Sequence, residues 1–285
     1  MLPREIDLHT HTTASDGSDE PAEVVRKAAQ LGLQAIAVTD HDTVTGIPEA
    51  LAEGERLGVE VIPGIEVSAD YRGNRAHILG LFIDPYAESL RPVLDWADNQ
   101  RLLRNGRIVE ALAADGFDIS MAALLEEYPA SMLGRPHIAE HLMNKGYVSS
   151  VQEGFERYLD KGRPYYRARE RISLQEAARC IGAAGGIAII AHPLQYRYDD
   201  EEVLRYIRTA LDAGCTGFEA FYSEHSPDQQ QRLLELAERL DVPVSGGSDY
   251  HGTRKPAIRL GSGISDGLAI PRRVLEVLRT KVPEK

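Results

Sequence analysis

The order of strands and helices is first set by residues 5–41, which read EIDLHTHTTASDGSDEPAEVVRKAAQLGLQAIAVTDH. Glu5–Leu8 and Ala35–Val38 are predicted strands, and Glu20–Leu31 between them has the apolar spacing of a helix. A strand, a helix of ten or more residues and a second strand indicate a βα unit with parallel strands. This segment therefore predicts an α/β fold.

The same alternation continues in two further parts of the chain. Its predicted strands and helices are Ile47–Leu57, Val59–Ile62, Ala76–Ile83, Leu174–Ala184, Ile187–Ala191, Asp200–Ala213, Gly217–Phe221, Asp228–Leu240 and Val242–Ser245. The stretch between them contains only predicted helices, at Asn99–Ala114, Met121–Tyr128, Pro136–Lys145 and Val151–Tyr158. We therefore expect a mainly parallel sheet or barrel formed by residues 1–98 and 169–285, with a helical insertion at 99–168 that is suited to capping the open end of a barrel.

The composition is ordinary for a soluble globular protein, with 43% hydrophobic and 27% charged residues among 285. The 32 basic and 44 acidic residues give a net charge of −12, which argues against binding to duplex DNA. Cys180 and Cys215 form no CxxC pair, no apolar run is long enough to span a membrane, and Arg4, Glu5 and Asp7 argue against a signal peptide. We expect a cytoplasmic protein with no evident protein partner.

Histidine and acidic residues recur at or near the ends of the predicted strands. His9 and His11 are two residues apart, so both side chains of this strand end point to the same side. The other residues of this kind are Asp16, His41, Glu66, His77, His192, Asp249 and His251. The carboxyl ends of parallel strands open on one face, so the placement predicts a single cluster. Imidazole and carboxylate ligands suit Mn, Fe or Zn.

Each of these residues also has an ordinary structural interpretation. A single histidine at a strand end is more often a hydrogen-bonded residue of the core or a loop, and Asp16 or Asp42 is suited to capping a helix. Five separate segments with the same placement are hard to explain as coincidence. We therefore favour a metal site.

Six segments occur in the same order as the motifs of one known family. They are Asp7–His11, Thr39–His41, Gly64–Glu66, His77, Ala191–Pro193 and Ser248–His251. In these segments the chain resembles the PHP (polymerase and histidinol phosphatase) phosphoesterases of the amidohydrolase superfamily. The resemblance implies a distorted (β/α)₇ barrel with up to three divalent metal ions, expected to be Mn. No expected ligand position is empty, which favours an active enzyme over an inactive PHP binding or structural module.

The resemblance also implies a ligand set and a reaction. The first metal takes His9, His11, Glu66 and Asp249, the second shares Glu66 and adds His77 and His192, and the third takes Asp16, His41 and His251. Divalent metals lower the pKa of water toward neutrality, so that it attacks phosphorus as hydroxide. We expect hydrolysis of a phosphomonoester, with Glu66 among the catalytic residues.

Three more segments, Gly134–Ala139, Tyr158–Gly162 and Phe218–Ser226, resemble the TrpH-like branch of stand-alone bacterial PHP proteins. This resemblance implies removal of the 3′-phosphate from nucleoside 3′,5′-bisphosphates. A 5′–3′ exoribonuclease acting on short 5′-phosphorylated RNA is the alternative. Histidinol-phosphate hydrolysis and cleavage of a C–N bond also remain open.

A bisphosphate needs donors for a second phosphate. Arg135, His137 and Lys161 are the candidates, and His225 is the candidate for contacting the scissile phosphate or protonating the leaving oxygen. The alternatives are a helix start at Arg135, a helix end at Lys161 and a solvated loop at His225. Other residues are more often structural, although they are also suited to binding: Phe221 and Tyr222 as strand core, His141 as a packed histidine, and Arg101, Arg104, Arg107, Arg163, Arg167, Arg169 and Arg171 as solvated or ion-paired side chains.

Overall fold

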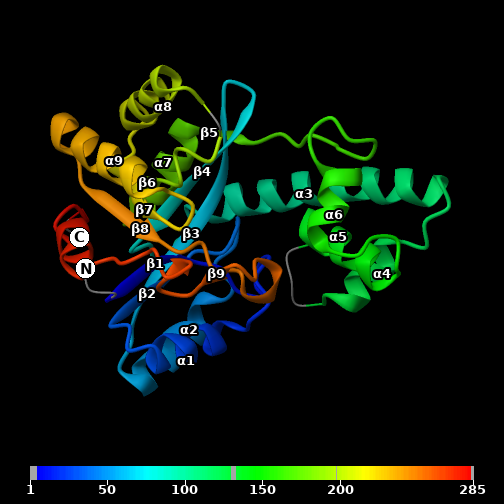
Figure 1. The fold of residues 1–285 in the computed structure, drawn as a ribbon, viewed down its shortest axis with the longest axis horizontal. Helices are drawn as coiled ribbons and strands as arrows, with labels where there is room; N and C mark the ends of the chain where they lie inside the picture. Colours follow the sequence, from blue (N-terminus) through cyan, green and yellow to red (C-terminus); the bar gives the residue numbers. More distant parts are fainter. Residues whose placement is uncertain (1–4, 130–132, 197, 284–285) are drawn as a thin grey trace.

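The computed structural model describes residues 5–129, 133–196 and 198–283. A strongly curved sheet forms one part of the molecule, and a group of helices stands to one side of it along the long helix α3 (Figure 1). The strands of the main sheet are β1 (Ile6–Thr10), β2 (Ala35–Val38), β3 (Glu60–Tyr71), β4 (Asn74–Leu81), β5 (Ile172–Ser173), β6 (Ile187–Ile190), β7 (Gly217–Tyr222) and β8 (Val244–Gly247). A separate antiparallel ribbon contains β9 (Ile258–Arg259) and β10 (Gly263–Ile264).

The main sheet has the order β1-β2-β3-β4-β6-β7-β8, and β5 pairs with β3. It nearly closes, because the chain beyond β8 returns to β1: the amide of His11 donates to the carbonyl of Tyr250 and that of Asp249 to the carbonyl of His9, both at 2.9 Å. A β-carbon on Gly247 would lie 2.2 Å from Cβ of His9, so glycine is required at this approach. The predicted distorted seven-stranded barrel is confirmed.

The main distortion of the barrel is strand β4. It runs antiparallel to both β3 and β6, whereas the other pairs along the sheet are parallel. The short connection between Tyr71 and Asn74 explains this, because a parallel strand needs a crossover of a dozen or more residues. The predicted alternation is thus correct for the other strands, and β4 is added by a hairpin.

Amphipathic helices cover the outside of the barrel. They are α1 (Pro21–Gln30), α2 (Ile47–Leu57), α7 (Leu174–Ala183), α8 (Asp200–Asp212), α9 (Pro227–Leu240) and α10 (Arg273–Arg279). In α9, Ser226 caps the first turn, Pro227 begins it, and Leu233, Leu236 and Ala237 are buried. No helix within the described ranges is long and apolar enough to cross a membrane.

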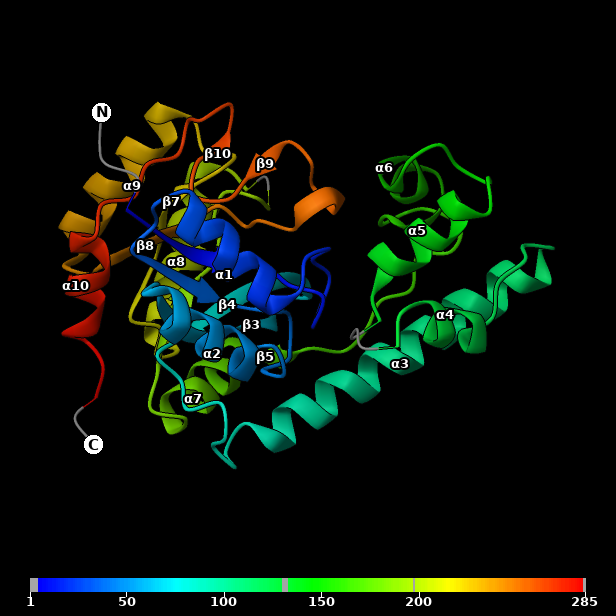
Figure 2. The same cartoon turned by 90° about the horizontal axis from the view of Figure 1, so that it is seen from below.

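The helical part has its own apolar core. It contains α3 (Arg91–Ala114), α4 (Met121–Glu127), α5 (Arg135–Asn144), α6 (Val151–Gly154) and a π-helical turn η1 (Phe155–Leu159). Ile108, Leu112, Leu124, Ile138 and Leu142 belong to this core, which is separate from that of the barrel. Figure 2 shows α3 running from the barrel to the other insertion helices. It begins before residue 99, and the division into domains at 98 and 168 stays a prediction that the separate cores support.

Candidate metal centre

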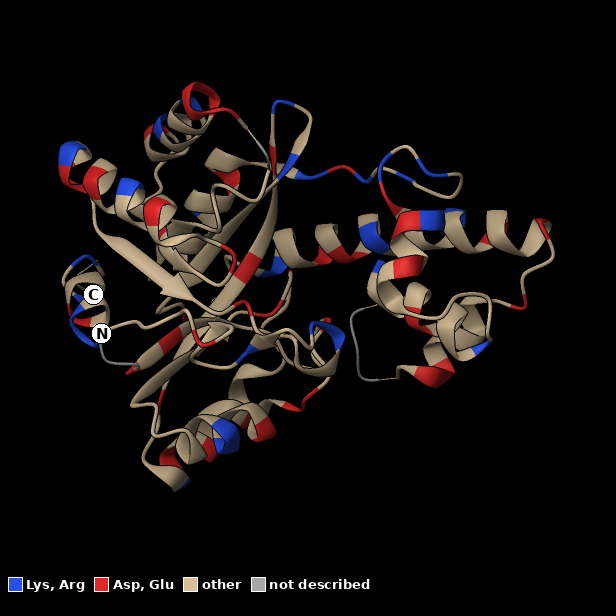
Figure 3. Cartoon of the chain, in the orientation of Figure 1, with Lys and Arg blue, Asp and Glu red and all other residues tan. Residues whose placement is uncertain are grey.

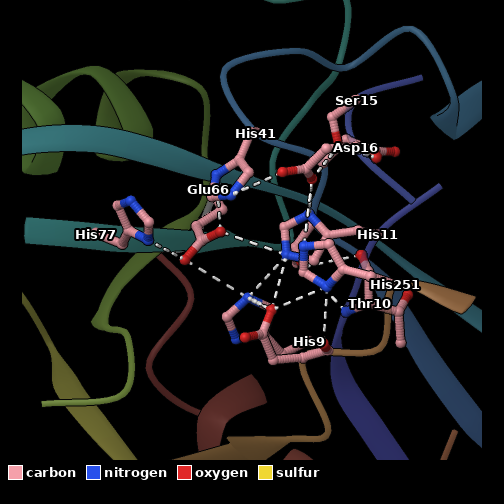
Figure 4. Close-up of polar contacts among 12 residues, drawn as sticks. His9, Thr10, His11, Ser15, Asp16, His41, Glu66, His77 and His251 are labelled. Carbon is pink, nitrogen blue, oxygen red and sulfur yellow. Dashed lines mark hydrogen bonds and ion pairs between the residues drawn. The ribbon is translucent and has the colours of Figure 1, made fainter. Parts of the chain in front are cut away.

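The structure brings all nine predicted ligand residues into one cluster (Figure 4). Their side chains come from β1, β3 and β4 and from the loops that follow β1, β2, β6 and β8. Eight of the nine are buried, and the His41 side chain is 15% exposed. Because β4 is antiparallel, His77 reaches the cluster from the early part of its strand, opposite Ser68 of β3.

Glu66 lies among five histidines of this cluster. Its Oε1 atom is 2.7 Å from His77 Nδ1, 3.0 Å from His192 Nε2 and 3.6 Å from His9 Nε2. Its Oε2 atom is 2.8 Å from His41 Nδ1 and 3.3 Å from His11 Nε2. The two carboxylate oxygens thus face different sets of imidazoles, as a carboxylate that bridges two cations does.

The donor set fits divalent cations. His9 Nε2 lies 3.1 Å from His11 Nε2, and His77 Nδ1 lies 3.3 Å from His192 Nε2. Two nitrogens that bind one ion at about 2.1 Å and at right angles are about 3 Å apart. His11 Nδ1 and His192 Nδ1 are also buried without a hydrogen-bond partner in the described part of the chain. The His9–His11 and His77–His192 nitrogen pairs are thus spaced as two ligands of one shared cation are.

Four overlapping groups of ligand atoms are close enough to hold an ion. They are His11, Asp16, His41 and His251; His9, His11 and Asp249; His9, Glu66 and His192; and His41, Glu66 and His77. Glu66 belongs to two groups, in keeping with a bridging role. The assignment of each residue to a particular ion stays a prediction.

Glu66 and His11 have the charge states of metal ligands. Burial raises the pKa of Glu66, but His41, His77 and His9 lower it well below its usual range. Burial and the neighbouring His251 lower the pKa of His11 to about 3. Ionised carboxylates and neutral imidazoles are the forms that bind metals.

A tenth side chain, Glu219 of β7, supports the cluster from behind. It is fully buried; its Oε1 atom lies 3.0 Å from His9 Nδ1, and its Oε2 atom accepts from the amide of His192 at 2.7 Å. A carboxylate bound to the far nitrogen of a ligand histidine fixes the orientation of its ring. The sequence analysis missed this residue, although an acid within the apolar strand Gly217–Phe221 was an available signal.

We predict that Glu219→Gln lowers the affinity for the divalent ion by about 10- to 100-fold, because the amide loses the charge that orients His9. Isothermal titration of metal-stripped protein measures this change. Glu238→Gln on the exposed side of α9 is the matched control, and it should bind as the parent chain does. An unchanged affinity in Glu219→Gln would show that the carboxylate only fills space.

Three residues around the cluster have positive φ angles: Asp42 at 54°, His192 at 29° and Asp249 at 59°. Non-glycine residues in this region are concentrated at functional sites. Asp42 accepts from the amide of Ser68 at 2.7 Å, from Arg169 Nη2 at 2.7 Å and from Arg101. It therefore joins the loop of His41 to the insertion.

The suggested role of Asp16 and Asp42 as helix caps is wrong. The residue at the N-cap of α1 is Glu20, and that of α2 is Gly46. Asp16 instead contacts His251 of the cluster, and Asp42 contacts Arg101 of the insertion. The reason is that the chain passes the barrel opening before each helix begins.

The cluster opens into a cavity of 470 Å³ between the barrel and the insertion. Insertion residues of its wall include Pro136, Gln152 and Phe155. Three cationic residues line it as well: Arg75 of β4, Arg254 of the 3₁₀ turn η2 (Gly252–Arg254), and Lys255. Arg75 precedes His77 by two residues on the same strand face, so the sequence could have indicated that Arg75 lies near the cluster. Nothing in the local sequence indicates that Arg254 and Lys255 line the cavity.

The predicted substrate residues lie around this cavity rather than in its described wall. Arg135 Nη1 donates to the carbonyl of Leu159 at 2.9 Å, and Lys161 is exposed. His137 is buried: the amide of Gly134 donates to its Nδ1 at 3.0 Å, and Arg254 Nη1 lies 3.1 Å from its Nε2. Their roles in binding stay predictions.

The predicted leaving-group residue is His225. Its Nδ1 lies 3.0 Å from the carbonyl of Ala220. Its Nε2 is buried and has no hydrogen-bond partner among the described residues, so it is free to act as an acceptor. Burial lowers the pKa of the ring, which keeps it neutral. Its role in the reaction also stays a prediction.

Phe221, Tyr222 and His141, for which the sequence favours a structural role, all have structural contacts. Phe221 and Tyr222 are buried strand residues, and the Tyr222 hydroxyl donates to Asp249 Oδ2 at 2.8 Å. His141 Nδ1 lies 2.6 Å from Glu127 Oε2 within the insertion. Arg101 forms an ion pair with Asp42, as expected for one of the two structural roles, and Arg107 is exposed. Arg104 is buried rather than solvated.

Burial lowers the pKa of His137 to about 3, with Arg254 as the next cause. The unfolded chain therefore binds a proton at this residue below its ordinary pKa of about 6.5, whereas the folded chain does not. We predict that the stability contributed by neutral His137 is complete above pH 6.5. It then decreases by about 1.4 kcal/mol for each pH unit between 6.5 and 3. Urea unfolding across this range measures the slope.

The matched variant for this prediction is His137→Asn, which keeps a hydrogen-bonding side chain that does not titrate. The difference in slope between the two proteins isolates His137 from other groups. Equal slopes would contradict a neutral buried imidazole.

Comparisons with known proteins agree with this geometry. The PHP domain family profile matches residues 7–213. A 5′-3′ exoribonuclease of Haemophilus influenzae is 35% identical over 88% of this chain and 91% of its own length. A 3′,5′-nucleoside bisphosphate phosphatase of Chromobacterium violaceum is 36% identical over 86% and 87%.

Two further similar proteins are relevant to the chemistry and the fold. A phosphoribosyl 1,2-cyclic phosphate 1,2-diphosphodiesterase of Eggerthella lenta is 37% identical over 86% of this chain and 94% of its own. The crystal structure of a candidate metal-dependent phosphoesterase from Bifidobacterium adolescentis has a TM-score of 0.88 and 29% identity, covering 100% of this chain and 99% of that one. These relatives share phosphoester chemistry but differ in substrate.

Proposed function

This chain belongs to the PHP domain family of phosphoesterases, and on that premise we propose that it removes the 3′-phosphate from nucleoside 3′,5′-bisphosphates. The observation that supports this proposal most is the cationic wall beside the metal cluster. Arg75, Arg254 and Lys255 line the same 470 Å³ cavity as Glu66 and the histidines. A cavity of this size suits a small-molecule substrate.

Different side chains have different roles in the proposed reaction. Bound divalent ions would neutralise the phosphoryl oxygens and acidify water. Glu66 and the other eight ligands hold these ions, and Lys255 and Tyr222 hold Asp249 through its Oδ2 atom at 2.7 Å and 2.8 Å. Arg75 and Arg254 of the wall then bind the phosphate that is not cleaved. His225 keeps its proposed role at the scissile phosphate or the leaving oxygen.

The proposed ion is Mn²⁺, with Fe²⁺ or Zn²⁺ as alternatives, because the ligands are imidazole and carboxylate without thiolate. Elemental analysis of protein purified without added metal, followed by reconstitution with each ion, tests this assignment. A cluster that binds only a hard ion such as Mg²⁺ would contradict it.

Phosphate release tests the substrate. Mn-loaded protein is given adenosine 3′,5′-bisphosphate, the 3′-monophosphate and the 5′-monophosphate. We expect kcat/KM for the bisphosphate to exceed that for the 3′-monophosphate by about 100-fold, the value of one or two charge-assisted hydrogen bonds. The products are AMP and phosphate.

Two results would contradict the proposal. Equal rates for the mono- and bisphosphate would remove the site for the second phosphate, and no release from any of the three would remove the mononucleotide as substrate. The 5′–3′ exoribonuclease is the second candidate function, and the similarity to the exoribonuclease of Haemophilus influenzae, 35% identical over 88% of this chain, favours it.

A further inference from the structure

Few ion pairs join the barrel to the insertion and its two connections. The two parts have separate apolar cores. Within the described ranges, only two barrel residues form ion pairs across the boundary. Asp42 pairs with Arg101 and Arg169, and Arg254 pairs with Glu140 at 2.8 Å. The position of the insertion over the metal cluster therefore depends on a small number of charged contacts.

Asp42 contacts both connections between the two parts. Arg101 lies on α3, along which the chain leaves the barrel, and Arg169 lies on the segment along which it returns to β5. Figure 3 shows basic positions along both connections. The Oδ2 atom of Asp42 accepts from Arg169 Nη2 at 2.7 Å and also from Arg101 Nη2. One carboxylate oxygen thus holds the outgoing and the returning chain together.

The carboxylate of Asp42 is also fixed on the barrel side. Ser68 of β3 donates to it twice, from its amide to Oδ1 at 2.7 Å and from its hydroxyl to Oδ2 at 2.9 Å. The amide of Asp42 donates to the carbonyl of the predicted ligand Glu66 at 3.0 Å. These contacts relate the position of the insertion directly to that of β3, the strand that carries Glu66.

Two buried guanidinium groups share this single carboxylate. The side chains of Arg101 and Arg169 are 6% and 8% exposed, and Asp42 is the one carboxylate with which either forms an ion pair in the described chain. Removal of one partner from a buried ion pair leaves an uncompensated charge, which is strongly unfavourable. Without the charge of Asp42, two buried cations would repel each other, so we expect the two connections to separate.

The insertion supplies one wall of the metal cavity. Pro136, Gln152 and Phe155 line the cavity from the insertion, and Glu66 and Lys255 line it from the barrel. The width of the cavity is thus set by the way in which the insertion is held. A displaced insertion would leave the metal cluster in place but remove the wall that a nucleotide contacts and a smaller phosphate ester does not need.

We propose that Asp42 is a positioning residue that fixes the insertion over the metal cluster and thereby determines which phosphate esters bind tightly. The proposal rests on the proposed function and deepens it, because it assigns part of the substrate selection to a residue outside the described cavity wall. Asp42 acts through Arg101 and Arg169 rather than on the metal ions.

Kinetics with two substrates test this role in the Mn-loaded full chain. Asp42→Asn should raise KM for adenosine 3′,5′-bisphosphate about tenfold, the value of one charge-assisted hydrogen bond, and leave kcat/KM for p-nitrophenyl phosphate within about twofold. Arg169→Gln should raise KM in the same direction. It keeps the fold, because Asp42 and Arg101 remain as a one-to-one pair. Arg169→Lys keeps the charge and should restore most of the affinity.

Energy transfer between two dyes measures the position of the insertion without relying on turnover. The dyes are attached at Glu55→Cys on α2 and Glu110→Cys on α3, two exposed positions, and the parent chain controls for labelling of the buried Cys180 and Cys215. The distribution of transfer efficiency should broaden in Asp42→Asn and in Arg169→Gln.

Asp118→Asn is the matched control, because Asp118 forms its ion pair with Lys145 inside the insertion. It should change neither KM nor energy transfer. Unchanged transfer in both Asp42→Asn and Arg169→Gln would overturn the proposal. Equal losses with both substrates, together with a lower metal content, would also overturn it, because Asp42 would then act through His41. A parent chain that releases no phosphate from the bisphosphate would contradict the proposed function alone, since energy transfer decides the role of Asp42 independently.

Discussion

Glu66→Gln should lower kcat/KM for phosphate release by at least about 10³-fold, which corresponds to about 4 kcal/mol of transition-state stabilisation. The substitution keeps the size of the side chain but removes its charge. Five histidines face this one carboxylate, with the shortest distance 2.7 Å to His77. An amide there presents an N–H₂ group to nitrogens that must remain free for metal.

The measurement combines steady-state kinetics with the metal content of the same samples. Glu55→Gln, an exposed glutamate of α2, is the control and should keep both values. If Glu66→Gln lost activity at full metal content, the carboxylate would act in catalysis without being needed for binding. If it kept both, Glu66 would have no bridging role.

Removal of the metal should abolish phosphate release and lower the melting temperature. Without cations, the cluster places imidazole nitrogens 3.1 Å and 3.3 Å apart. An ion present at about a thousand times its Kd stabilises the folded chain by about 4 kcal/mol, and this contribution is lost on chelation. Calorimetry before and after dialysis against a chelator measures the loss.

Back-titration with Mn²⁺ provides the control, because activity and melting temperature should recover together. Binding should also release protons. Burial lowers the pKa of His9, but Glu219, Glu66 and Asp249 raise it well above its usual value, so a proton occupies that ring until a cation displaces it. A chelated protein with the original melting temperature and rate would contradict the metal centre.

Much of the metal centre is predictable from local sequence. His9 and His11 share a strand face because side chains alternate with a period of two, and His192 and Asp249 follow strands whose apolar residues are unmistakable. Parallel strands bring their carboxyl ends to one edge, so separate motifs meet without any knowledge of distant contacts.

The residues that the sequence analysis missed depend on contacts between distant segments. Glu219 differs from an ordinary buried strand residue only because His9, 210 positions away, turns its Nδ1 toward it. The Arg254 guanidinium at the cavity contacts Glu140 and His137 of the insertion and the carbonyl of Gly17, all far away in the sequence. Local periodicity contains no information about such pairs.

The sequence by itself therefore determined the alternation of strands and helices, the all-helical stretch in the middle of the chain and the convergence of nine histidine and acidic residues, because these follow from strand periodicity and parallel pairing. Only the tertiary structure decided the antiparallel course of β4, the support of His9 by Glu219 and the pairing of Asp42 with Arg101 and Arg169. The reason is physical. The orientation of a side chain and the pairing of buried charges are properties of groups that folding brings together, and a single segment of chain has neither.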